Sequence, residues 1–187
     1  MPTLDGLNSV VHNGLIRLLA AAEHCLDVNR LASVILIYAT IDAIAGLEVE
    51  GDHGGPEFKK WTARYFLHSL KRRDASLSDL TAEDIWIARC NVIHSFSSLS
   101  ERTTRDPGVA RLYYISRGSD FREEWKPPAL TGGRAIPVCV DDLCAALKDA
   151  IQEWRGLIAG DPKLLGQVNS KGEQFFSQTQ EQDVYFD

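Results

Sequence analysis

Apolar residues recur at three- and four-residue spacing along most of this chain, a period that predicts helices. A first helix is expected over residues 4–25 and a second over about 29–47. The second is apolar on nearly every side, which is typical of the central helix of a bundle. A third helix is expected over 57–70, after a loop that ends at Pro56, a residue suited to the first helical turn.

Two more helices are expected later in the chain. Thr81 and Asp84 form a capping pair for a fourth helix, which should reach Phe96 or beyond. Asp141 caps a last helix, with apolar residues at helical spacing as far as Trp154.

Between the fourth and last helices the pattern changes. The runs 112–115 and 135–140 are β-branched or aromatic and are bounded by Gly and Pro. They predict a small β-hairpin, or two edge strands joined by a long loop, within about 110–140. The expected fold class is therefore all-α: a bundle of about five helices over residues 1–160, with a small β-hairpin insertion before the last helix. Residues 161–187 turn polar and rich in Gln, which predicts a polar C-terminal tail.

Composition is that of one globular domain: 187 residues, 44% hydrophobic and 25% charged. The chain has four cysteines: Cys25, Cys90, Cys139 and Cys144. Their spacing is not that of a disulfide framework, so free thiols in a reducing compartment are expected. The longest apolar run, 33–47, contains Asp42 and is too short to span a bilayer, and the N-terminus does not read as a secretion signal. We expect a cytoplasmic protein with no membrane contact.

The net charge of −6 hides two basic regions. Residues 102–122 hold five arginines against Asp106 and Asp120. Residues 59–73 hold six cations and no acid: Lys59, Lys60, Arg64, Lys71, Arg72 and Arg73. Aromatic residues are interleaved with the six, a pattern that predicts an RNA-binding surface of phosphate contacts and base stacking. The alternative is a solvated helix face whose aromatics belong to the core.

An arginine lies inside the apolar arc of the fourth helix. On a helical wheel Arg89 falls among the residues expected to face the core. Its guanidinium cannot deprotonate there, so it must be paired, reach the rim, or open onto a cleft or partner. Asp42, a carboxylate on the otherwise apolar second helix, is the candidate for an internal pair.

Residues 88–95 read Ala-Arg-Cys-Asn-Val-Ile-His-Ser and contain R-x-x-x-x-H late in the fourth helix. The apolar second helix with Tyr38 and Asp42 precedes this motif, and residues 110–114 follow it. In motif and element order the chain resembles the HEPN family over residues 4–158, and more narrowly its small stand-alone bacterial members.

The resemblance implies a bundle that dimerises and brings two such motifs together across a cleft. Catalytic members are metal-independent endoribonucleases that use no cofactor. Carried over, Arg89 would stabilise charge, His94 would act as general acid or base, Asn91 would position phosphate or water, and Asp42 would be auxiliary. The chain departs from the family at Cys90, where a polar residue is often preferred.

The resemblance also suggests a defence or toxin–antitoxin setting, with RNA, a second copy of the chain and a protein such as an antitoxin as partners. Its alternative is a non-catalytic dimerisation or partner-binding module. In that case His94 is a histidine on a helix flank, bonded to a nearby carbonyl.

The same helix also carries a pair of residues with metal-ligand spacing. Cys90 and His94 are four residues apart, a spacing that could share a metal with Cys139 and Cys144. Since Cys139 belongs to an expected strand and nothing places it near Cys90, we expect no metal ligand in this chain.

Overall fold

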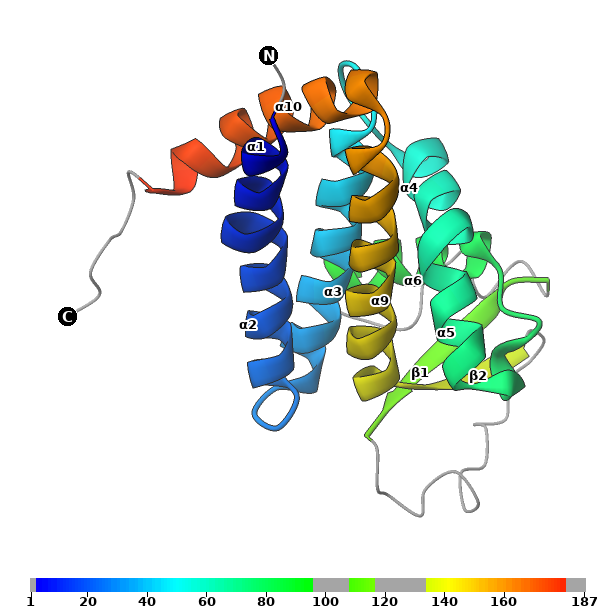
Figure 1. Ribbon diagram of the computed structural model, residues 1–187. Helices are drawn as coiled ribbons and strands as arrows, with labels where there is room; N and C mark the ends of the chain where they lie inside the picture. The colour runs from blue at the N-terminus through cyan, green and yellow to red at the C-terminus, as the bar shows by residue number, and fades with distance from the viewer. Residues whose placement is uncertain (1–2, 96–107, 117–133, 181–187) are drawn as a thin grey trace.

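The computed structural model describes residues 3–95, 108–116 and 134–180. These residues are mostly helical, with one two-stranded parallel sheet before the last two helices (Figure 1). The predicted helical class is confirmed.

The first helical stretch runs without a break from residue 4 to residue 25. It consists of α1 (Leu4–Ser9), a π-helical stretch (Val10–Ile16) and α2 (Arg17–Cys25). Thr3 caps it, since the Gly6 N–H donates to the Thr3 hydroxyl at 3.2 Å. One stripe of the helix is buried, as its spacing predicts: Leu7, Val11, Leu15, Leu19 and Ala22.

Helix α3 (Arg30–Leu47) is the central helix of the bundle. Its N-terminus is capped by Asn29, whose side-chain oxygen accepts from the Ala32 N–H at 3.2 Å. By length and composition α3 could cross a membrane, but more than half of it is buried inside the protein. Its apolar surface is therefore used for packing, with Ile37, Tyr38 and Ile41 fully enclosed.

The third helical stretch is longer than predicted and covers residues 55–73. It consists of α4 (Gly55–Trp61), a π-helical stretch (Thr62–Phe66) and α5 (Leu67–Arg73), with Pro56 in the first turn as expected. Helix α6 (Ala82–Ser95) follows, and Phe96, where the prediction placed its end, lies outside the described residues.

The two strands are parallel, so the predicted β-hairpin is wrong. Strand β1 (Ala110–Ile115) pairs with β2 (Arg134–Cys139) in a register that sets Ala110 beside Arg134. Asp84 binds the first residue of each strand, at the end where both strands begin. Pro137 lies in β2, where its missing N–H is tolerated at the open edge of a two-stranded sheet.

Two helices, not one, follow the sheet. Helix α9 (Val140–Ala159) is the predicted last helix, and α10 (Pro162–Gln180) occupies most of the predicted polar tail. Figure 1 shows α10 lying across one end of the bundle, over α1, α3 and α9. Residues 181–187 lie outside the described residues.

Polar side chains attach α10 to the bundle. Gln167 donates to the Leu47 carbonyl at 3.0 Å, and Lys171 donates to the carbonyls of Gly46 and Gly51 at 3.1 and 2.9 Å. These carbonyls lie at the C-terminal end of α3 and in the loop that follows, and a cation at a helix C-terminus also opposes the helix dipole. These hydrogen bonds act together with the burial of Leu165 and Val168 to hold α10 on the bundle.

Glu48, directly after α3, joins α3 to α9. The Trp154 indole N–H donates to Glu48 Oε1 at 2.7 Å. Burial raises the pKa of the Glu48 carboxyl, against the opposing effects of the Trp154 hydrogen bond and the charges of Arg64 and Lys60. The protonated form therefore suits the folded state better, and its stabilising contribution is lost as the pH rises through the folded-state pKa.

We expect Glu48→Gln to raise the melting temperature at neutral pH. Glutamine keeps an acceptor for Trp154 and resembles the protonated carboxyl at every pH. The gain should vanish below the ordinary pKa of 4.5, where the wild-type side chain is protonated in both states. Glu153→Gln, at an exposed position of α9, is the control for losing one charge. Equal melting temperatures for wild type and Glu48→Gln from pH 4 to 8 would contradict the prediction.

Candidate functional site

Arg89 and Asp42 form an ion pair between α6 and α3. Arg89 Nε donates to Asp42 Oδ2 at 2.8 Å, and a terminal guanidinium nitrogen donates to the same oxygen. The two side chains are only 17% and 16% exposed. The pairing expected from the sequence is confirmed, and it compensates the charge of an arginine on a largely apolar helix.

An aromatic ring supports the guanidinium. Arg89 Cζ lies 5.0 Å from the centroid of the Trp86 ring, one turn earlier on α6. Trp86 in turn packs on Phe58 of α4, with ring centroids 5.2 Å apart. The carboxylate and the ring together restrict Arg89 to one orientation.

A buried tyrosine, Tyr38, and a partly buried one, Tyr114, lie next to this pair. Tyr38, one turn before Asp42 on α3, shares a hydrogen bond of 2.8 Å with the Tyr114 hydroxyl of β1. Burial raises the pKa of both phenols well above the ordinary value, so both stay protonated at neutral pH. The contact therefore ties β1 to α3, and neither phenol is suited to proton transfer at that pH.

The remaining residues of the expected motif lie on α6. Asn91 is buried, and its separation of two residues from Arg89 places it on a different face of the helix. It shares a face with Asp84, seven residues earlier, which contacts β1. His94 lies in the last turn of α6, but its side chain is outside the described part of the structure.

The basic helical stretch, residues 59–73, uses several of its cations within the chain. Lys59 pairs with Glu83 at 2.8 Å and Arg73 with Asp149 at 2.6 Å. Arg72 donates to the Ser69 hydroxyl, and Arg64 lies 5.0 Å from the centroid of the Tyr65 ring. These contacts are partly exposed, so each contributes little to stability.

The aromatic residues of the same stretch do not face solvent. Trp61, Tyr65 and Phe66 are all buried in the hydrophobic core. They cannot stack on RNA bases while the bundle is folded, so the predicted base stacking is wrong and the alternative, aromatics that belong to the core, is confirmed. The positive charge of the stretch remains.

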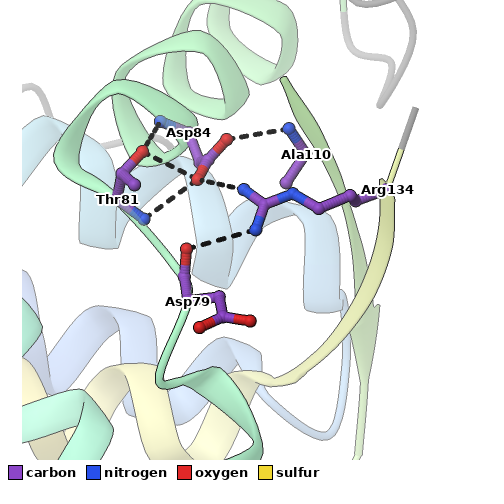
Figure 2. A network of polar contacts seen from close by, with 5 residues as sticks. All are labelled: Asp79, Thr81, Asp84, Ala110 and Arg134. Atoms are coloured by element: carbon purple, nitrogen blue, oxygen red, sulfur yellow. Dashed lines mark hydrogen bonds and ion pairs between the residues drawn. The ribbon is translucent and has the colours of Figure 1, made fainter. Parts of the chain in front are cut away.

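Asp84 is the residue whose importance the sequence understated. Its Oδ2 accepts from the Thr81 N–H and hydroxyl, at 2.9 and 2.7 Å, and the Thr81 hydroxyl accepts from the Asp84 N–H, so the predicted capping box is confirmed. Figure 2 shows two further donors on the same carboxylate. The Ala110 N–H lies 2.8 Å from Oδ1, and Arg134 lies 3.1 Å from Oδ2. Asp84 thus joins the start of α6 to the start of both strands.

The buried cysteines belong to the core. Burial raises the pKa of the Cys144 thiol to about 11 and also raises that of Cys139. Both thiols are therefore poor nucleophiles and poor metal ligands at neutral pH. Within residues 3–95, 108–116 and 134–180, no three His, Cys, Asp or Glu side chains lie close enough to hold a metal ion.

Comparison with known proteins adds no relative: no family model, curated protein or solved structure matches this chain. The resemblance to the HEPN family stays a prediction, and the fold and ion pair described above are the basis for inferring function.

Proposed function

We propose that this protein is a metal-independent endoribonuclease of the HEPN type. The observation that carries the proposal is the geometry of Arg89, a cation oriented by Asp42 and Trp86 and still partly exposed. A preorganised guanidinium is suited to a phosphorane, because its charge and planar fork are in place before the reaction.

His94 would supply the proton transfer. Cleavage by the RNA 2′-hydroxyl needs a group that titrates near neutral pH, and histidine is the side chain that does so without a perturbed pKa. In the proposal two copies of the chain form a dimer in which both Arg89–His94 motifs line one cleft.

The packing around Arg89 supports an RNA path along the basic helix. Phe58 of α4 touches Trp86, the ring that supports Arg89, and the adjacent Lys59 pairs with Glu83 in the first turn of α6. The N-terminal end of the basic stretch therefore lies beside the candidate site, where its charge would attract phosphates.

A second candidate is a non-catalytic dimerisation or partner-binding module. The Arg89–Asp42 pair favours it, because a carboxylate already compensates the guanidinium and the pair could serve the fold alone. In a toxin–antitoxin setting the partner would be a protein such as an antitoxin.

The two candidates are separated by an RNA-degradation assay in EDTA. We expect wild-type protein to cleave RNA and His94→Ala to be slower by about 100-fold or more, the usual effect of losing a general acid or base. His24→Ala, at an exposed position in the last turn of α2, is the matched control and should cleave like wild type. Absence of cleavage by the wild type would favour the binding module, and equal cleavage by His94→Ala would contradict the role given to His94.

A further inference from the structure

Arg111 on β1 has no counter-charge among the described residues. It is 9% exposed, and its Nε has no hydrogen-bond partner in residues 3–95, 108–116 or 134–180. Within the described part of the chain its guanidinium contacts only the Tyr113 hydroxyl, at 3.5 Å, the outer limit of a hydrogen bond. None of the carboxylates in the described ranges forms an ion pair with it.

Two other partly buried arginines of this region do have carboxylate partners. Arg89 pairs with Asp42, and Arg134 pairs with Asp84. A guanidinium remains charged at any ordinary pH, and an enclosed charge without an anion is strongly unfavourable. An anion that completes the shell of Arg111 would therefore be bound favourably.

The strand register describes the surroundings of Arg111. It sets Arg111 beside Ala135 and Tyr113 beside Pro137. Side chains alternate between the faces of a strand, so these four lie on one face, opposite the face of the buried Leu112 and Val138. Across the sheet Arg111 lies beside Ala135, whose side chain offers neither a charge nor a hydrogen-bonding group.

We propose that Arg111 is a buried anion-binding position on β1 and that its ligand is a phosphate group. The planar fork of arginine matches two phosphate oxygens, and the Tyr113 hydroxyl lies beside it. The proposal does not depend on ribonuclease activity, since phosphate binding is measured on the resting protein.

The test is the thermal stability of the full chain as inorganic phosphate is titrated, with sodium chloride at matched ionic strength as reference. Arg111→Met removes the charge and keeps the apolar stem. Arg17→Met, at an exposed position of α2, removes an equal charge elsewhere. Phosphate should raise the melting temperature of wild type and Arg17→Met. In Arg111→Met its affinity should fall by about tenfold or more, and the melting temperature without phosphate should be no lower than that of wild type.

Three results would overturn the proposal. An unresponsive wild type, with Arg111→Met less stable than wild type, would mean that a carboxylate of the chain itself neutralises Arg111. An equal phosphate response in wild type and Arg111→Met would place the phosphate elsewhere. A response to acetate as strong as that to phosphate would mean that the position takes carboxylates, which overturns the assignment of a phosphate ligand.

Discussion

Replacing Asp84 with alanine is expected to lower the free energy of unfolding by about 3 kcal/mol. The substitution removes the cap of α6 and leaves the buried Ala110 N–H without its acceptor. The loss of the ion pair between Asp84 and Arg134 should contribute less to the free energy change, because the Arg134 side chain is 41% exposed and water can hydrate it. Urea denaturation monitored by circular dichroism measures the change.

Asp79→Ala is the matched control for Asp84→Ala. Asp79 belongs to the same network, but it takes part through its backbone carbonyl, which accepts from Arg134 at 3.3 Å (Figure 2). Removing its exposed carboxylate should leave stability within about 0.5 kcal/mol of wild type. Equal losses for Asp79→Ala and Asp84→Ala would mean that local charge, and not the hydrogen bonds of Asp84, stabilises this region.

Asp42→Ala should also cost about 3 kcal/mol, because it leaves the Arg89 guanidinium without its carboxylate in a largely buried position. A second substitution, Arg89→Met, should restore part of the loss, since a buried ion pair replaced by apolar groups is often tolerated. The measurement is a double-mutant cycle on the free energy of unfolding.

The same cycle separates a structural from a functional pair. If Arg89 acts on RNA, the double variant should regain stability and remain unable to cleave. A melting temperature unchanged by Asp42→Ala would show that the two charges do not stabilise each other in solution.

The sequence by itself determined most of the helical scaffold. The prediction of a helix over 29–47 agrees with α3 (Arg30–Leu47), because an apolar stretch with a good N-cap has few alternatives. The Thr81–Asp84 capping box was visible because both partners lie within one turn. The Arg89–Asp42 pair was predictable for another reason. Each residue is the unusual charge on the apolar face of its own helix, and a buried charge is strongly destabilising unless a counter-charge compensates it.

Only the tertiary structure decided the direction of the strands and the wider role of Asp84. Short apolar runs look alike in parallel and antiparallel pairs, so local pattern could not distinguish them. The donors that bind the Asp84 carboxylate at the start of both strands come from Ala110 and Arg134, which are 26 and 50 residues from Asp84. A separation of that length leaves no local sequence pattern.

The tertiary structure likewise decided where the polar C-terminal helix and the aromatic residues of 59–73 pack. Helix α10 was missed because its apolar period is short: Leu165 and Val168 are buried in the core, while most of its other residues are polar. Gln167 and Lys171 add hydrogen bonds to the end of α3. From the sequence, the aromatic residues of 59–73 could have faced either RNA or the core. They are buried in the core because their own helix packs against α3 and α9. Periodicity predicts where a helix forms, while the partners of its side chains depend on which distant segments come to lie beside it.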